Sequence, residues 1–262
     1  MSEVDTTEEE GKDRLFVSAL ARGLSVLAAF RPGEGALSNL ALAQRTGLPK
    51  STVSRLTYTL TRLGYLSQDE ITGFYRLGIS ALTLGSAVLA SYDIRQLAAP
   101  LMREFALDHT VSVSLAVRDG TDMVYLETCR SQARVSVQLT VGSRVPVATT
   151  AIGRAYYAGL AEPERRRLEG ELAQRYGTRW AELSAKLDEA VAEYRRQGYS
   201  ASFGEYEPDV MAVGVHLPSP APGQPPMSLN ASGPAFVFDA ATMRERIAPA
   251  LQALRERLIP SR

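Results

Sequence analysis

The stretch SNLALAQRTGLPKSTVSRLTYTLTRLG, residues 38–64, carries the clearest structural pattern in the chain. Ser38 is a favourable N-cap for a helix over residues 39–46, and Gly47 is a favourable C-terminal stop for that helix. The turn at residues 47–49 then leads into a second helix over residues 50–63. Two short helices joined by a tight, glycine-containing turn form a helix-turn-helix unit, whose second helix enters the major groove of DNA.

The apolar residues of this stretch recur at helical spacing, which predicts the face that each helix presents to the core. In the first helix, Leu40 and Ala43 are expected to face inward. In the second helix, the expected inward stripe consists of Val53, Leu56, Leu60 and Leu63.

The outer face of the second helix carries basic, hydroxyl and aromatic side chains and no carboxylate, a composition that suits DNA. We expect Lys50, Ser51 and Thr52 to contact phosphate, because a helix N-terminus favours anions. Arg55 and Tyr58 are candidates for base contacts, since arginine can form two hydrogen bonds with guanine. The other outward residues are Ser54, Thr59 and Arg62. An ordinary solvated helix face is the alternative.

The flanking segments extend this unit to a winged helix-turn-helix domain over residues 13–77. A helix is expected from Ser18, ended by the Arg31-Pro32-Gly33 step, and its spaced apolar residues are Leu20, Leu24, Leu27 and Phe30. Residues 65–67 and 74–77 flank a turn-prone segment and predict a β-hairpin wing. Arg22 and Arg76 are expected to contact the DNA backbone, and an ordinary surface arginine is an equally good interpretation of each.

The distribution of charge favours a nucleic-acid partner, although the whole chain has a net charge of zero. Residues 14–77 contain eight basic and three acidic residues, which gives this segment a net charge of +5. Residues 1–12 are polar and acidic without hydrophobic periodicity, and we expect them to form a disordered acidic arm. The carboxylates of this arm conceal the basic excess in a sum over the whole chain.

The rest of the chain predicts a linker and a larger α+β domain. Residues 78–90 are mostly apolar without a charged face, so we expect a linker helix within residues 78–96 that packs between domains or protomers. Within the second domain, residues 97–262, the expected helices are 97–108, 151–160, 163–176, 184–197 and 240–258. The expected antiparallel strands are 111–118, 123–129, 134–141, 210–217 and 227–231.

Catalytic and metal chemistry have little support in the sequence. His109, His216 and the lone Cys129 are far apart, whereas a metal site needs three or four ligands at compatible spacing. No Gly-x-Ser-x-Gly elbow and no phosphate-binding glycine loop is present. We therefore predict no catalytic residue, no metal and no cofactor. A single cysteine, no apolar signal segment and no membrane-spanning run predict a cytoplasmic protein.

Several blocks, in order over about residues 15–238, resemble the IclR family of bacterial transcriptional regulators. In the N-terminal part they are Arg22-Gly23-Leu24, residues 47–56, Gly64-Tyr65-Leu66 and Tyr75-Arg76-Leu77-Gly78. In the C-terminal part they are Thr150-Ala151-Ile152-Gly153-Arg154-Ala155, Gly198-Tyr199 with Glu205, and Leu229-Asn230-Ala231-Ser232-Gly233-Pro234. Their order and spacing make the resemblance strong.

The resemblance implies a GAF-like effector domain, in which an antiparallel sheet and flanking helices enclose a pocket for a small, often carboxylated or aromatic metabolite. It also implies homodimers, and homotetramers made of two dimers. The chain would then be a ligand-responsive transcriptional regulator that binds promoter DNA as a dimer or tetramer. The competing hypothesis is an enzyme whose second domain turns over a small molecule, but the candidate acids, bases and nucleophiles are scattered along the sequence.

The candidate effector-binding residues are Tyr125, Thr150, Ala151, Gly153, Glu205, Asn230 and Ser232. The small residues that follow the N-cap Thr150 would let a ligand anion approach the helix N–H groups, and close helix-to-sheet packing is the alternative. Asn230 and Ser232 are expected to share a strand face, with a turn at residues 232–234 as the alternative.

For the other two candidates, an ordinary structural role is the alternative to ligand binding: Glu205 could be solvated, and Tyr125 could fill the core. Ala148, Gly204 and His216 depart from the family pattern near the expected pocket, so the ligand class is not carried over.

Overall fold

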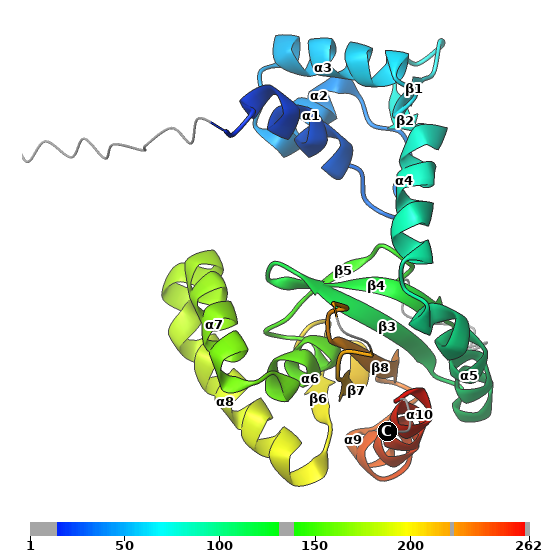
Figure 1. Ribbon diagram of the computed structural model, residues 1–262, viewed down its shortest axis with the longest axis vertical. Helices are drawn as coiled ribbons and strands as arrows, with labels where there is room; N and C mark the ends of the chain where they lie inside the picture. Colours follow the sequence, from blue (N-terminus) through cyan, green and yellow to red (C-terminus); the bar gives the residue numbers. More distant parts are fainter. Residues whose placement is uncertain (1–14, 131–138, 221–222, 260–262) are drawn as a thin grey trace, which may run out of the picture. The chain divides into compact units, whose positions relative to one another are not determined.

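The computed structural model describes residues 15–130, 139–220 and 223–259, and the chain divides into two compact units between Val88 and Leu89. Figure 1 shows the elements of both units in the order of the sequence. The expected disordered arm, residues 1–12, lies outside the described residues.

The N-terminal unit is a winged helix-turn-helix, as the sequence predicted. Its helices are α1 (Ser18–Ala28), α2 (Asn39–Thr46) and α3 (Lys50–Arg62), and its wing pairs β1 (Leu66–Gln68) with β2 (Tyr75–Leu77). The Ser38 hydroxyl accepts a hydrogen bond from the Ala41 N–H, and Gly47 ends α2 in the left-handed conformation. A two-residue bridge between Leu37 and Tyr75 joins the wing to the segment before α2. The cap, the stop and the hairpin were therefore all predicted correctly.

Part of the predicted inward face of these helices was wrong. Leu40 is 47% exposed and Leu63 is 59% exposed, and Leu20 and Leu24 are also exposed. The fully buried positions are Val26 in α1, Leu42 in α2, and Val53 and Thr57 in α3. Thr57 tolerates burial because its hydroxyl donates to the Ser54 carbonyl, 3.1 Å away. The core of a three-helix unit this small covers only a narrow strip of each helix, so part of each apolar stripe stays exposed.

The helix α4 (Ile79–Ala90) begins where α3 and the wing meet, and a glycine permits that junction. A Cβ atom on Gly78 would lie 2.1 Å from the Gly64 carbonyl oxygen, so no other residue fits there without a backbone shift. Across this contact the Gly78 N–H donates to the Tyr65 carbonyl over 2.8 Å, and the Ser80 N–H donates to the Gly64 carbonyl over 3.3 Å. The first turn of α4 is thus held against the C-terminal end of α3.

The C-terminal unit is built on a six-stranded antiparallel sheet with the strand order β5-β4-β3-β8-β7-β6. The strands are β3 (Ser112–Asp119), β4 (Asp122–Cys129), β5 (Arg144–Pro146), β6 (Ser200–Phe203), β7 (Val210–Leu217) and β8 (Met227–Pro234). The helices are α5 (Ile94–His109), α6 (Ala151–Gly159), α7 (Glu162–Tyr176), α8 (Trp180–Gln197), α9 (Ala240–Thr242) and α10 (Ala248–Leu258), with a π-helical turn at Met243–Ile247. The predicted α+β class is confirmed.

The differences from the expected elements are local. Residues 134–138 of the strand expected at 134–141 lie outside the described residues, and Leu139 to Val141 are not in a strand. The short strands β5 and β6 were not predicted, α5 begins at Ile94 and α8 begins at Trp180. The strand β8 continues to Pro234, so Ser232 is a strand residue paired with Ser112 and Ala212, and the alternative of a turn at 232–234 is wrong.

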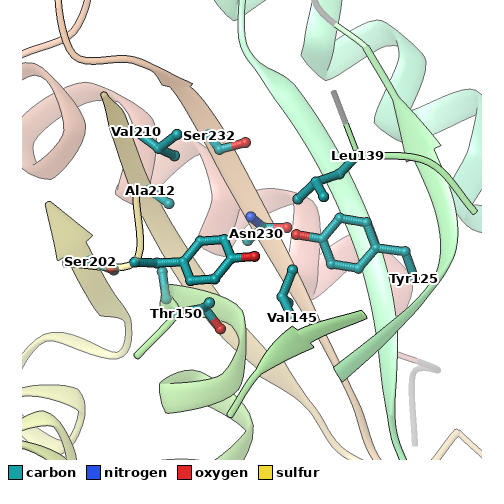
Figure 2. A pocket seen from close by; sticks show the side chains of 11 residues that line it. Tyr125, Leu139, Val145, Thr150, Ser202, Val210, Ala212, Asn230 and Ser232 are labelled. Carbon is teal, nitrogen blue, oxygen red and sulfur yellow. The ribbon is translucent and has the colours of Figure 1, made fainter. Parts of the chain in front are cut away.

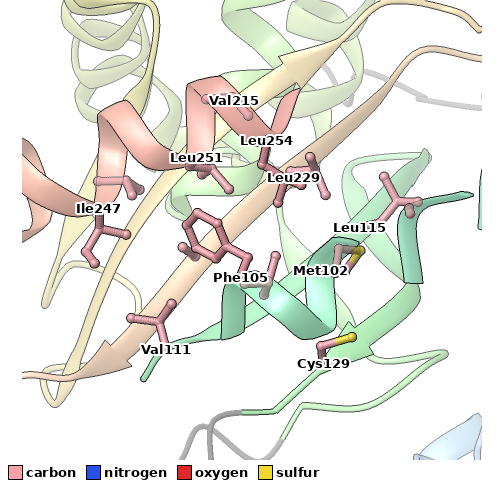
Figure 3. Close-up of a cluster of buried hydrophobic side chains, with 14 of the residues drawn as sticks. Met102, Phe105, Val111, Leu115, Cys129, Val215, Leu229, Ile247, Leu251 and Leu254 are labelled. Atoms are coloured by element: carbon pink, nitrogen blue, oxygen red, sulfur yellow. The ribbon is translucent and has the colours of Figure 1, made fainter. Parts of the chain in front are cut away.

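The sheet has two chemically different faces, and helices cover both of them (Figure 1). One face packs Val113, Leu115, Val215 and Leu229 against α5 and α10 in a large apolar core. Figure 3 shows Met102 and Phe105 of α5 and Leu251 of α10 pointing into this core. The opposite face is covered by α6, with α7 and α8 outside it, and carries buried polar residues such as Ser228 and Asn230 beside a second apolar cluster. The polar face is the one that can bind a polar molecule.

A buried histidine lies on this second face. His216 of β7 is 8% exposed, its ring lies against Gly159 of α6, and its Nδ1 atom has no hydrogen-bond partner in the described structure. The backbone groups of His216 both have hydrogen-bond partners: its N–H donates to the Tyr194 hydroxyl, and its carbonyl accepts from Arg255 Nε. Burial, together with the charge of Arg255, lowers the pKa of the imidazole to about 4. The ring is therefore neutral in the folded protein.

We predict that His216 makes the C-terminal unit acid-sensitive. The histidine in the unfolded chain takes up a proton near its ordinary pKa of about 6.5, whereas in the fold it does so only near 4, so stability falls as the pH drops between those values. From pH 7 to pH 5 the expected loss is about 2 kcal/mol. Urea unfolding at both pH values should show this loss in the parent and not in His216→Phe. His109→Gln is the matched control, and an equal pH dependence in parent and His216→Phe would contradict the assignment.

Candidate nucleic-acid interface and ligand pocket

The outward face of α3 has the composition and exposure that the sequence predicted. Lys50, Ser51, Ser54, Arg55, Thr59 and Arg62 are exposed, Tyr58 is 66% exposed, and Thr52 is half-buried. In the described part of the chain no ion pair involves Lys50, Arg55 or Arg62. These cations are thus available to an anionic partner.

Two of the hydroxyl groups on this face already have partners within the unit. Ser54 Oγ donates to the Lys50 carbonyl and accepts from Asn39 Nδ2, both at 3.0 Å, and Thr59 Oγ1 donates to the Arg55 carbonyl. Pro49 precedes the helix and provides no side-chain cap for its first turn. The N–H groups of that turn therefore remain free of a side-chain acceptor, which suits a phosphate oxygen.

The arginines outside α3 differ in their surroundings. Arg45 pairs with Glu34 and also donates to the Ala29 carbonyl, so it connects α2 to the end of α1 instead of facing a partner. Arg22 on α1 and Arg76 on β2 are exposed. Beside Arg76, Asp69 organises the tip of the wing, where its carboxylate accepts hydrogen bonds from Thr72 and Ile71 that lower its pKa.

In the C-terminal unit, a narrow pocket lies between the start of α6 and the polar face of the sheet. Its cavity volume is only about 30 Å³, and the unfilled space reaches about 400 Å³ when its opening to solvent is included. Its lining residues are Tyr125, Leu139, Val145, Thr150, Ala151, Ser202, Tyr206, Val210, Ala212, Asn230 and Ser232. Figure 2 shows the Tyr125 hydroxyl and the Asn230 amide pointing toward each other across this space.

Five of the seven candidate effector residues line this pocket: Tyr125, Thr150, Ala151, Asn230 and Ser232. Thr150 is the N-cap of α6, as predicted, because its hydroxyl accepts from the Gly153 N–H at 3.2 Å and donates to the Pro146 carbonyl at 2.6 Å. Asn230 and Ser232 point to the same side of β8.

The polar atoms of the pocket are not all satisfied. Asn230 is 5% exposed, and its Oδ1 atom has no partner in the described structure. Burial raises the pKa of the Tyr125 hydroxyl well above its usual range, and hydrogen bonding from Asn230 and Ser114 opposes that shift only in part. Tyr125 is therefore a neutral phenol at physiological pH.

The other two candidates, Gly153 and Glu205, lie outside the pocket lining. A Cβ atom on Gly153 would lie 2.4 Å from the Val147 Cα atom, so this glycine serves the close packing that was the alternative interpretation. Glu205 pairs with the buried Arg154, whose Nη2 lies 2.5 Å from Glu205 Oε2. Burial raises the pKa of the Glu205 carboxyl, but Arg154 outweighs that effect and the net shift is downward. Glu205 thus pairs with Arg154 while its own side chain stays 40% exposed to solvent, and it does not line the pocket.

Sequence reasoning missed Arg154 and the lining residues that follow Glu205. Arg154 also donates to the carbonyls of Ala148 and Ala201, at 3.2 and 3.1 Å, so it joins the start of α6, the strand β6 and the Glu205 loop. That loop brings Tyr206 and Val210 to the pocket. The signal in the sequence was Arg154 within a helix start otherwise made of small and apolar residues.

Among the described residues, no helix combines the length and the apolar character that crossing a membrane requires. The same ranges contain no cluster of three or more His, Cys, Asp or Glu side chains suited to a metal ion.

Sequence comparison supports both halves of this description. Residues 19–70 match the model of the IclR helix-turn-helix domain, and residues 86–258 match the model of the bacterial transcriptional regulator IclR C-terminal domain. The HTH-type transcriptional regulator TsaQ1/TsaQ2 of Comamonas testosteroni is 32% identical over 95% of this chain and 89% of its own length. The Pca regulon regulatory protein of Pseudomonas putida is 29% identical over 91% of this chain and 81% of its own length.

Solved structures show the same architecture. An IclR family transcriptional regulator from Brucella abortus superposes with a TM-score of 0.79 at 38% identity, covering 98% of this chain and 95% of that one. An IclR homologue from Microbacterium hydrocarbonoxydans, in complex with 4-hydroxybenzoate, shares the fold with a TM-score of 0.71 at 24% identity, covering 92% of this chain and 97% of that one. With a DNA-binding helix-turn-helix in one unit and a helix-covered antiparallel sheet in the other, the chain belongs to the IclR family of bacterial transcriptional regulators.

Proposed function

We propose that this regulator binds promoter DNA as a dimer or tetramer and that a small metabolite in the pocket beneath α6 modulates its binding. The observation that carries the ligand proposal is the pocket itself, which is lined by five residues expected from the sequence and contains a buried amide oxygen without a partner. The DNA-binding role is that of the family. The ligand and the assembly state are the parts that need a test.

The dimer proposal rests on the surface of α4. No residue of this helix is buried, although Ile79, Leu82, Leu84 and Val88 are each more than half exposed. An apolar helix exposed to water is unfavourable by about 25 cal/mol per Å² of apolar surface, which favours association. A two-fold pair would also place two α3 helices on two DNA half-sites.

The effector proposal rests on differential binding. A ligand alters DNA affinity only if it binds two conformations of the regulator unequally. The pocket is bordered by α6, by the edge strands β5 and β6 and by the Glu205 loop, which are separate elements that a ligand can hold together. The Microbacterium homologue was solved with 4-hydroxybenzoate, so a screen of small carboxylic acids and phenols should start with that compound.

Salt should weaken binding to duplex DNA steeply. If Lys50, Arg22 and Arg76 of each protomer neutralise phosphates, a dimer releases about six counterions, and affinity should fall on the order of 10³-fold from 50 to 200 mM salt. Fluorescence anisotropy with promoter fragments, and sedimentation of the complex to obtain its stoichiometry, measure both quantities. A monomeric complex, or affinity that does not change with salt, would contradict the proposal.

Substitutions should separate base contacts from phosphate contacts. Arg55→Ala removes an exposed guanidinium from α3 and is expected to weaken specific binding by about 1 to 3 kcal/mol and to relax discrimination at one base position. Arg76→Ala, on the wing, should weaken binding to all sequences alike. Titrations against matched and single-mismatch operators compare the two variants. Undiminished sequence preference in Arg55→Ala would remove this residue from the base-reading set.

Filling the pocket should abolish the response to the effector. Ala151 is buried at the start of α6, and Ala151→Leu would occupy the ligand space at an overpacking cost of about 1 to 3 kcal/mol. Calorimetric titration of the best compound from the screen, followed by an operator-release assay, should show loss of binding and of release. Ala181→Leu, the same change on an exposed position of α8, is the matched control. Parent-like affinity and release in folded Ala151→Leu would place the effector site elsewhere.

A further inference from the structure

The pocket beneath α6 is closed too tightly in this structure to hold a metabolite. Its cavity volume is about 30 Å³, and one water molecule needs roughly 10 to 15 Å³ of such space, so the cavity admits about two waters. A metabolite is several times larger. A ligand can therefore enter only if at least one wall of the pocket moves.

Most of the walls belong to the sheet or to the helix packed on it. Ala212 and Asn230 lie on β7 and β8, which pair along their whole length. The start of α6 lies in backbone contact with β7, since a Cβ atom on Gly214 would lie 2.5 Å from the Ala151 carbonyl oxygen. Moving these walls would break the fold, so we do not expect them to separate.

The Glu205 loop, residues 204–209, is the wall that can move most easily. It connects β7 to β6, the last strand in the order of the sheet, and its second half is exposed to solvent. Its two ends are joined, because the Gly204 N–H donates to the Val210 carbonyl over 2.9 Å. Between these ends the loop places Tyr206 in the lining of the pocket. A movement of this loop about its joined ends would thus widen the pocket and leave the sheet intact.

The ion pair between Arg154 and Glu205 holds the middle of this loop. Arg154 Nη1 and Nη2 donate to the two carboxylate oxygens of Glu205 over 2.8 and 2.5 Å. Arg154 is only 5% exposed and also donates to the carbonyls of Ala148 and Ala201, which fixes it within the unit. The Glu205 side chain is 40% exposed, so the carboxylate is the partner that can move into solvent.

We propose that the Glu205 loop is a lid on the pocket and that the Arg154–Glu205 pair holds this lid closed, so that a ligand enters by separating the pair. In the open arrangement the Glu205 carboxylate is hydrated and Tyr206 moves out of the lining. Two hydrogen bonds between charged groups stabilise the closed arrangement.

This inference rests on the effector role proposed for the pocket, because that role requires a ligand to enter. A ligand too large for the closed cavity binds only the open arrangement of the lid. The lid thereby supplies the unequal affinity for two conformations that regulation by a ligand requires.

The test measures access to the pocket with a thiol and needs no effector. Ala212 is 6% exposed and lines the pocket, so Ala212→Cys places a thiol there that iodoacetamide alkylates when the pocket opens. Cys129, the lone native cysteine, is buried on the opposite face of the sheet and reports opening of the whole unit in the same sample. Mass spectrometry of the two peptides gives both alkylation rates on the full-length protein.

Glu205→Gln in this Ala212→Cys background removes the charge that pairs with Arg154. The lid should then open more often, and the thiol at position 212 should react on the order of tenfold faster while the rate at Cys129 stays unchanged. Glu207→Gln, the same change on an exposed carboxylate of the same loop, is the matched control and should change neither rate. Glu205→Asp keeps the charge but shortens the side chain by one methylene, so it should give a smaller increase and serves if Glu205→Gln does not fold.

Several results would overturn the lid. An unchanged rate at position 212 in both Glu205 variants would mean that the pair does not control access and that ligands enter elsewhere, for example beside Leu139. An equal increase at position 212 and at Cys129 would make the pair a support of the whole unit. A thiol at position 212 that reacts as fast as an exposed one in the Ala212→Cys protein itself would mean that the pocket is not closed.

None of these results decides the effector role, which the operator-release assay on Ala151→Leu tests separately. Conversely, parent-like release in Ala151→Leu would remove the effector role from this pocket and leave the alkylation rates unaffected. The failure of the lid and the failure of the proposed function are thus distinguishable.

Discussion

The close contact between the backbone of α6 and the sheet determines the form of the C-terminal unit. A Cβ atom on Gly214 would lie 2.5 Å from the Ala151 carbonyl oxygen, and the Gly153 backbone lies equally tightly against Val147. With no side chain as a spacer, the sheet beneath the helix carries small residues such as Ala116, Ser228 and Ser232, and the ring of His216 fits only against Gly159. The larger apolar cluster lies on the opposite face, against α5 and α10. The polar, partly unfilled space that remains at the start of α6 is a consequence of this division.

Much of this arrangement could be read from local sequence. The N-cap at Thr150, the alternation that puts Asn230 and Ser232 on one face, and the glycine stop of α2 follow from short-range stereochemistry. The Arg154–Glu205 pair does not, because its partners are 51 residues apart in the chain and local sequence does not indicate which carboxylate the arginine meets. The short strand β5 gives too few residues for a reliable alternation, and its pairing with β4 is decided by the sheet and not by its own composition.

The N-terminal unit shows a related limit. Helical periodicity correctly predicted that α1, α2 and α3 each have an apolar side, but it did not predict how much of that side would be buried. Leu40 and Leu63 are exposed, while Thr57, a polar residue, is fully buried because it can bond to its own helix. In a core formed by three short helices and a wing, the burial of a residue depends on where the helices cross, and the spacing of apolar residues contains no information on that.

The junction at Gly78 has a mechanical consequence. Because the backbone of Gly64 contacts Gly78 directly and Ser80 donates to both the Leu63 and the Gly64 carbonyls, the end of α3 and the start of α4 share hydrogen bonds instead of a flexible connection. We therefore expect the end of α3 to follow a movement of the start of α4. A displacement of α4 would then change the tilt of α3, because the hydrogen bonds at Gly78 and Ser80 connect the two helices directly.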